Sequence, residues 1–116
     1  MNISFITRFF RWMGTNRFKR FELLLPTKYN DGTAIELEKF NQTARELTDR
    51  LSGLTQDLVH AQGIFGGNIY YDKLLRLRID SVDPDATTFM KSFKKTLKQR
   101  FQQLDIWITA HEIEII

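Results

Sequence analysis

The period of the apolar residues changes repeatedly along this chain, and the order of the changes restricts the fold more than any other feature. Alternate positions are apolar in residues 17–26 and 69–80, as in strands with one buried face. Spacings of three and four residues follow both segments, as in helices that pack on one side. Further strands are indicated for residues 58–65 and 106–116. The predicted order is strand, helix, strand, strand, helix, strand.

Two helices are predicted from their apolar stripes and from signals at their ends. Residues 33–36 fit a capping box, in which the Thr33 hydroxyl and the Glu36 carboxylate satisfy backbone donors, and Gly53 is expected to end the first helix. Asp83 and Pro84 supply an N-cap and a first-turn proline for the second helix. The residues expected on the two inner faces are Leu37, Phe40, Ala44, Leu47, Leu51 and Leu54, then Ala86, Phe89, Met90, Phe93, Leu97, Phe101 and Leu104.

Turn residues and strand alternation assign faces to the remaining strands. Residues 66–68 are Gly, Gly and Asn, which permit positive φ and predict a three-residue hairpin connection. Leu75, Leu77 and Ile79 alternate with Leu74, Arg76 and Arg78. Since the second set carries two guanidinium groups, the first set is expected to face the core. In the last strand the alternation changes phase near His111, which predicts a bulge at that residue or at Glu112.

Two split βαβ halves in this order predict an α+β fold, the ferredoxin-like βαββαβ sandwich. Its four-stranded antiparallel sheet carries both helices on one face, and right-handed crossovers place the first and third strands in the centre. Residues 17–116 are assigned to this domain. Residues 1–16 form a basic, aromatic N-terminal extension. Within it, residues 3–13 are expected to form a short helix that docks on the domain or mediates self-association rather than binding a membrane.

Composition and charge limit the classes of function. The 116 residues suit one domain, and the absence of cysteine excludes disulfides, thiolate metal sites and a cysteine nucleophile. Five of the 17 Lys and Arg lie in residues 1–20, which contain no acid, so the remaining 12 face 14 acids and the body carries a net −2. The basic pI therefore describes an arm rather than a binding face. No secretory signal or long apolar span is found, so we expect a cytoplasmic protein.

The sheet face opposite the helices holds the main candidate contact residues. Because strands alternate, that face is expected to combine apolar and charged side chains, with Arg20 and Thr109 among them. A clustered apolar patch usually marks an interaction site, so we predict a homo-oligomer, a dimer, or a protein partner bound there. Opposite charges such as Glu22 with Arg76 or Arg78 are expected to pair. The candidate residues are Glu22, Leu24, Leu74, Arg76, Arg78, Trp107 and His111.

Two other functions stay open at this point. The first is a small enzyme or metal-dependent nuclease with a polar site beside Glu22, Arg76, Arg78 and His111, or built from acids among Asp31, Asp72, Asp80, Asp83 and Asp85. No ligand spacing sets a metal site for His60 and His111, so no metal is expected, and no motif indicates a cofactor. The second is single-stranded nucleic-acid binding, although the central strands lack outward aromatic residues and the basic helix face is typical of a solvated one.

A turn and three short motifs complete the candidates. Tyr29, Asn30 and Asp31 precede Gly32 in a turn and are turn candidates for a site. The motifs FELLLP at residues 21–26, YNDG at residues 29–32 and KQRFQQLDIWI at residues 98–108 resemble a group of short bacterial proteins of unknown function. The resemblance covers residues 20–116 and implies a bacterial protein, with no activity, cofactor or catalytic residue to carry over.

Overall fold

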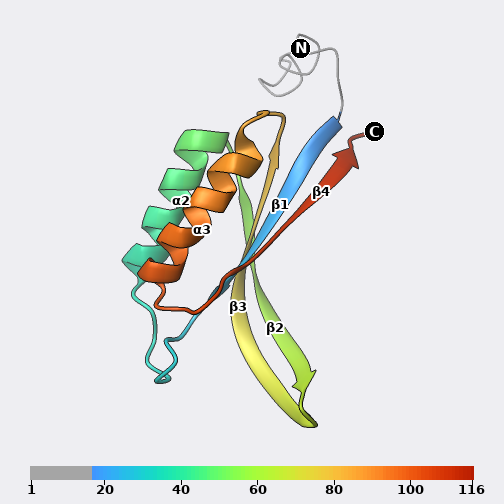
Figure 1. The fold of residues 1–116 in the computed structure, drawn as a ribbon. Coiled ribbons are helices and arrows are strands. Elements are labelled where there is room, and N and C mark those ends of the chain that lie inside the picture. The colour runs from blue at the N-terminus through green and yellow to red at the C-terminus, as the bar shows by residue number, and fades with distance from the viewer. Residues whose placement is uncertain (1–16) are drawn as a thin grey trace.

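Four strands and two helices follow one another in the predicted order in the computed structural model, which describes residues 17–116 (Figure 1). All strand pairs are antiparallel, and the sheet order is β2-β3-β1-β4, so the first and third strands are central as predicted. Both helices cover one face of the sheet, which confirms the ferredoxin-like fold. The elements are β1 (Arg17–Pro26), α2 (Leu37–Leu51), β2 (Thr55–Phe65), β3 (Asn68–Ser81), α3 (Ala86–Arg100) and β4 (Trp107–Glu114). The helix predicted for residues 3–13 lies outside the described residues.

The core lies between the helices and the sheet and confirms the assignment of the strand faces. Phe21, Leu23 and Leu25 of β1 are buried, and so are Leu77 and Ile79 of β3. These side chains share one face of the sheet because alternate residues of a strand point the same way. The buried residues that the helices supply are Leu47, Leu51, Ala86, Met90, Phe93 and Leu97, with Phe101 directly after α3.

The start of α2 differs from the prediction. The helix begins at Leu37, and its N-cap residue Glu36 makes no side-chain capping bond, so the capping box at residues 33–36 is wrong. The Thr33 hydroxyl donates to Asp31 at 2.6 Å, and Glu36 accepts from the Tyr29 hydroxyl. The Asp31 carboxylate, which is nearer in the turn, therefore binds the Thr33 N–H and hydroxyl that the predicted cap would use. Leu37, the first residue of α2, is 72% exposed, so the apolar stripe predicted for this helix does not include it.

Other element ends also move by a few residues. At the end of α2 the positive φ falls on Ser52 rather than on Gly53. The N-cap position of α3 is Asp85, and the Asp83 carboxylate accepts the Asp85 N–H at 2.8 Å, in a turn that precedes the helix. Leu104 is 92% exposed, since the chain has already left the helix.

The pairing of the edge strands corrects two further predictions. The register of β1 with β4 is continuous from Arg17↔Glu114 to Leu24↔Trp107, so there is no bulge near His111. Residues 66 and 67 alone form the hairpin turn, with φ of 59° and 79°, while Asn68 pairs with Phe65. A two-residue turn with positive φ at both positions matches the twist of the strands it joins. Within residues 17–116 no helix is both long and apolar enough to cross a membrane.

We expect a pH-dependent contribution from the ion pair between Arg50 of α2 and Asp83. The Arg50 guanidinium and the Asp85 N–H hold the pKa of the Asp83 carboxyl below its ordinary value of 3.8. Because the folded pKa is the lower one, the pair stabilises the protein fully above pH 3.8 and its contribution is lost as the pH falls through the lowered pKa. Asp83→Asn should lower the free energy of unfolding by about 0.5–1 kcal/mol at neutral pH.

Urea unfolding of wild type and Asp83→Asn at pH 7 and well below pH 3.8 checks this expectation, and the difference should shrink in acid. Asp49→Asn is the matched control, because Asp49 is exposed and lies beside Arg50 on α2. This substitution should change the free energy of unfolding little at either pH. A loss for Asp83→Asn that is the same at both pH values would contradict the ion-pair explanation.

Candidate functional site

The structure brings the seven candidate contact residues onto the sheet face that the helices leave open. Strand pairing fixes their neighbours: Leu24 lies between Arg76 and Trp107, and Glu22 lies between Arg78 and Thr109. In the next row Arg20 lies between Asp80 and His111, and Leu74 pairs with Pro26. We call this surface the open face. Its candidate residues are Glu22, Leu24, Leu74, Arg76, Arg78, Trp107 and His111.

Each arginine of the open face is bound to a carboxylate of the same face. Arg76 donates two hydrogen bonds to Asp57, at 3.0 and 2.6 Å, and Arg20 donates two to Asp80, at 2.7 and 3.0 Å. Arg78 donates to Glu22 at 2.9 Å, which is one of the pairs expected from the sequence. The residue that sequence reasoning missed here is Asp57, the partner of Arg76.

These pairs also shift the ionisation of their members and stabilise the charged forms. The hydrogen bond to Arg76 lowers the pKa of the Asp57 carboxyl, and the same bond raises the pKa of Arg76. The bond to Asp80 raises the pKa of Arg20. The open face is therefore a nearly neutral surface whose charges already satisfy one another. A catalytic site would need such groups directed at a substrate.

The metal-dependent alternative finds no support in the described part of the chain. Among residues 17–116 no group of three or more His, Cys, Asp or Glu side chains is placed to hold a metal ion. His60 and His111 are not brought together, because one lies on edge strand β2 and the other on the opposite edge strand β4. Of the acids considered for a nuclease, Asp80 and Asp83 are engaged with Arg20 and Arg50.

The apolar part of the open face is exposed at its centre and continues into a projecting hairpin. Trp107 is 66% exposed, while Leu24 and Leu74 are half-buried. Beyond Leu74 neither β1 nor β4 continues, so the sheet consists of two strands only, from the pair His60↔Lys73 to the pair Phe65↔Asn68. Figure 1 shows this part of β2 and β3 extending away from both helices.

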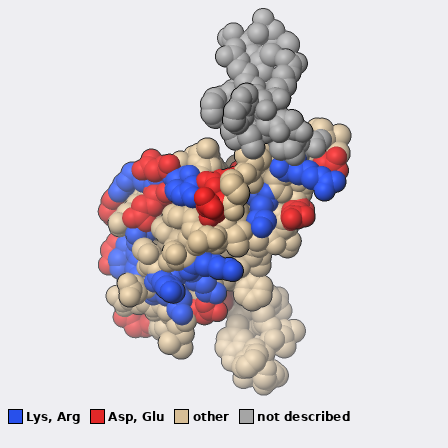
Figure 2. All heavy atoms as spheres, turned by 45° about the horizontal axis from the view of Figure 1, so that its top comes forward, with Lys and Arg blue, Asp and Glu red and all other residues tan. Residues whose placement is uncertain are grey.

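The hairpin is apolar on both of its faces. Residues 61–71 contain no charged side chain, and on the side of the molecule seen in Figure 2 the projecting part is free of Lys, Arg, Asp and Glu, whereas charged side chains cover the helices. Exposed edge strands usually carry charges that prevent association, so this composition is unusual for a strand pair that meets only water. The exposed large side chains of this segment and its base are Leu58, Ile64, Phe65, Ile69, Tyr70 and Tyr71. The uncharged run in residues 61–71 is the sequence signal that could have identified it.

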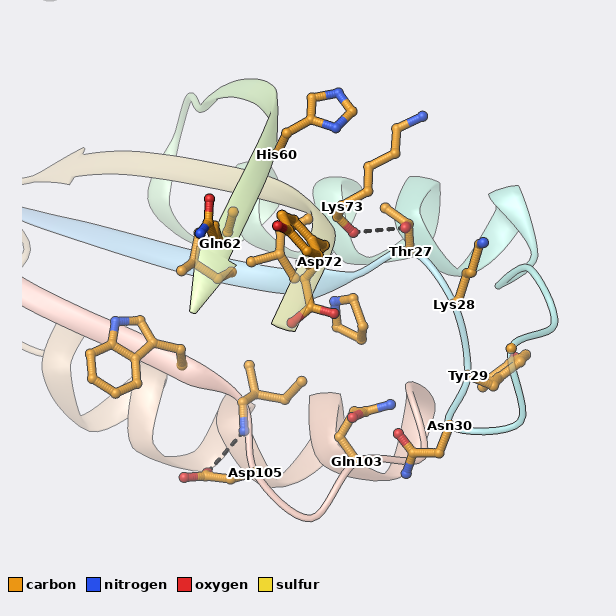
Figure 3. Close-up of a pocket in the computed structure, with 18 residues that line it drawn as sticks. Thr27, Lys28, Tyr29, Asn30, His60, Gln62, Asp72, Lys73, Gln103 and Asp105 are labelled. Carbon is orange, nitrogen blue, oxygen red and sulfur yellow. Dashed lines mark hydrogen bonds between the residues drawn. The ribbon is translucent and has the colours of Figure 1, made fainter. Parts of the chain in front are cut away.

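A cleft of about 1030 Å³ lies beside the base of the hairpin (Figure 3). One wall is formed by the hairpin, and the other by residues 27–30, 32, 103 and 105–107. Of the three turn candidates, Tyr29 and Asn30 line the cleft, whereas Asp31 does not.

Two of the turn candidates have contacts that hold the turn together. The Asp31 carboxylate accepts from the Thr33 N–H and hydroxyl, which lowers the pKa of Asp31. The Tyr29 hydroxyl donates to Glu36 and accepts from the Lys39 ammonium at 2.5 Å. Lys39 also donates to the Arg100 carbonyl at 2.9 Å, so this network ties the turn to the end of α3.

Comparison with known proteins finds the fold and no family. No family model and no curated protein matches the sequence. The chain is similar in structure to the PII-like protein CutA from Nostoc sp. PCC 7120 in apo form, with a TM-score of 0.58 and 15% identity over 82% of this chain and 80% of that one. It is also similar in structure to a phage SAM lyase in complex with S-methyl-5′-thioadenosine, with a TM-score of 0.57 and 12% identity over 88% of this chain and 92% of that one. CutA from Synechococcus elongatus PCC7942 gives a TM-score of 0.53 at 8% identity over 88% and 80%. At these identities the likeness establishes the fold alone.

Proposed function

We propose that this protein is a small non-catalytic domain that self-associates, and that copies meet through the open face and the projecting hairpin. The observation that carries the proposal is the hairpin beyond Leu74, which has two strands and no charge in residues 61–71. Among residues 17–116, no layer packs on either face of this hairpin. A two-stranded ribbon is marginally stable in water by itself. Packing against another copy would remove its apolar side chains from water and support it.

The charge arrangement of the open face favours burial in such a contact. Arg20, Arg76 and Arg78 each bring a carboxylate partner from their own chain. Burying an unpaired charge is costly, whereas a pair that is already formed and hydrogen-bonded lowers that cost. The open face therefore can be covered by a second copy without leaving arginines unpaired.

The hairpin and the apolar residues of the open face, Leu24, Leu74 and Trp107, are separate surfaces of one chain. A second copy presents the same two surfaces and can therefore cover both. Trp107, the most exposed large side chain of the open face, is the residue type that most often dominates binding energy at interfaces. The smallest assembly of this kind is a dimer, which we propose as the working state. We also propose the cytoplasm as the location, on the basis of the cysteine-free sequence.

The test is the mass of the full chain in solution, measured by light scattering during size-exclusion chromatography. Wild type should elute as a multiple of the 13.8 kDa chain. Trp107→Glu places a charge in the contact and should weaken association about 30-fold or more, because truncating a hot-spot residue costs about 2 kcal/mol or more. Leu74→Glu should act in the same direction.

The matched control is Leu37→Glu, a substitution at the first residue of α2, whose exposure of 72% is close to the 66% of Trp107. This variant should keep the wild-type mass. A wild-type protein that is monomeric at its highest soluble concentration, or a Trp107→Glu variant with unchanged mass, would refute the proposal.

A further inference from the structure

Three basic side chains from three segments of the chain gather at the base of the hairpin, on one side of the cleft. His60 of β2 and Lys73 of β3 are direct partners in the strand ladder. The Thr27 hydroxyl donates to the Lys73 carbonyl at 2.7 Å and so fixes the position of the neighbouring Lys28 beside this pair. Figure 3 shows the side chains of His60, Lys73 and Lys28 projecting in the same direction. We call these three residues the basic cluster.

The basic cluster has no acidic partner among residues 17–116. Lys28, His60 and Lys73 take part in no ion pair and their side chains make no hydrogen bond there, whereas Arg20, Arg45, Arg50, Arg76, Arg78 and Arg100 all pair with carboxylates. Basic groups placed directly opposite each other in a ladder repel when both are charged. An anion bound between them would remove that repulsion.

An exposed aromatic ring adjoins the cluster. Tyr71 is two residues from Lys73 on the same face of β3, so the two Cα atoms are about 7 Å apart. Tyr71 is 74% exposed and lines the cleft, as does its ladder partner Gln62. Two carboxylates also line the cleft: Asp105, which is paired with Lys94, and Asp72, which lies on the face of β3 opposite to Lys73 and Tyr71. The face that carries Lys73 therefore combines a flat ring for stacking, an amide for hydrogen bonding and cations for an anionic group.

We propose that the basic cluster and Tyr71 bind a small phosphorylated ligand that carries an aromatic ring, as a nucleotide does. The phosphate group contacts Lys28, Lys73 and His60, and the ring stacks on Tyr71. Lys91 and Lys95 of α3 are exposed and, within the described residues, also lack ion pairs, but they do not line this cleft and make no contact with an aromatic ring, which makes them a suitable control. The proposal uses neither Trp107 nor the hairpin tip and does not depend on self-association.

Calorimetric titration of the full chain tests the site with three probes, ADP, adenosine and pyrophosphate, and a single-stranded oligonucleotide is titrated for comparison. Among the three probes ADP should bind most tightly, because it alone offers both ring and phosphate. The double substitution Lys28→Gln with Lys73→Gln should weaken ADP and pyrophosphate by about tenfold or more, since each lost charge-assisted contact is strong, and should leave adenosine unchanged. Tyr71→Ala should weaken ADP and adenosine and leave pyrophosphate unchanged. Lys91→Gln with Lys95→Gln should leave all three as in wild type.

Four results would overturn the inference. They are a wild-type chain that binds neither ADP nor pyrophosphate, unchanged ADP binding after Lys28→Gln with Lys73→Gln, an equal loss in the Lys91 and Lys95 control, and tighter binding of a single-stranded oligonucleotide than of ADP. The mass of each sample, measured in parallel, shows whether the chain self-associates, so the result for the ligand site can be read independently of the result for self-association. A monomer that binds ADP with the expected pattern refutes only self-association, and an oligomer that binds no probe refutes only the ligand site.

Discussion

Phe101→Ala is expected to lower the free energy of unfolding by about 3–5 kcal/mol, the usual cost of removing a buried phenyl ring. Phe101 follows the last residue of α3 and is fully buried. Its ring centroid lies 5.3 Å from that of Phe40 on α2, so the side chain joins the two helices at one end of the core. Truncation leaves a cavity that the backbone cannot close, because Phe101 N–H is fixed to the Leu97 carbonyl at 2.9 Å. Tm should fall by about 15–30 °C.

Leu104→Ala is the matched control, since Leu104 stands one helical turn after Phe101 in the same apolar stripe of the sequence. Leu104 is 92% exposed, so its truncation should change the free energy of unfolding by less than about 0.5 kcal/mol. Urea unfolding of wild type and both variants gives the comparison. Similar losses for the two variants would contradict the placement of the core at the end of α3.

Phe101 and Leu104 illustrate what periodicity can and cannot predict. A stripe at spacings of three and four identifies a helix and its inner face, but it continues to match past the residue where the helix ends. The chain leaves α3 at Gln102, which has a φ of 53°, and the next apolar residue of the stripe turns to solvent. The faces of the strands could be predicted more reliably than the ends of the helices. Alternation assigns each residue of a strand to a face whatever the length of the strand, and the inward positions of β1 and β3 were predicted correctly.

Helix starts were mispredicted because several short polar side chains competed for the same backbone donors. Thr33 and Glu36 have capping chemistry, yet Asp31 is close enough to take the Thr33 N–H and hydroxyl first. Asp83 and Asp85 pose the same choice at α3: the carboxylate of Asp83, which precedes Pro84, accepts from the Asp85 N–H in a turn, and Asp85 at the N-cap position makes no side-chain capping bond. A turn and a cap both satisfy backbone donors with a nearby polar side chain, so residue type alone does not show which of the two will form.

The residues of the open face could be predicted, but the ion-pair partner of Arg76 could not. A partner on β2 depends on the strand register, and the register depends on the length of the hairpin turn. With Gly66 and Gly67 alone in the turn, Arg76 stands opposite Asp57. A third residue in the turn, as the sequence suggested, would have placed Leu58 there. The hairpin projects because β3 is longer than β1. The alternation within one strand does not show how far its neighbour in the sheet extends, so this projection could not be predicted from it.

Shortening the hairpin is expected to abolish self-association while the domain stays folded. In the variant, residues 62–71 are replaced by Gly-Gly, so that the ladder partners Ala61 and Asp72 flank a new two-residue turn of the kind now formed by Gly66 and Gly67. None of the deleted residues is buried, so the free energy of unfolding should change by less than about 1 kcal/mol. Light scattering should give the mass of a single shortened chain.

A second variant of full length identifies which property of the hairpin matters. Phe65→Lys with Ile69→Lys keeps the strands and adds charge to both faces of the tip, which are now uncharged. If burial of apolar surface drives association, both variants should be monomeric, because each removes that surface by a different means. If the shortened chain is monomeric but the lysine variant keeps the wild-type mass, backbone hydrogen bonds along the edge of β2, and not burial of apolar side chains, hold the copies together. An unchanged mass for both variants would remove the hairpin from the interface, and Trp107 on the open face would have to account for the contact alone.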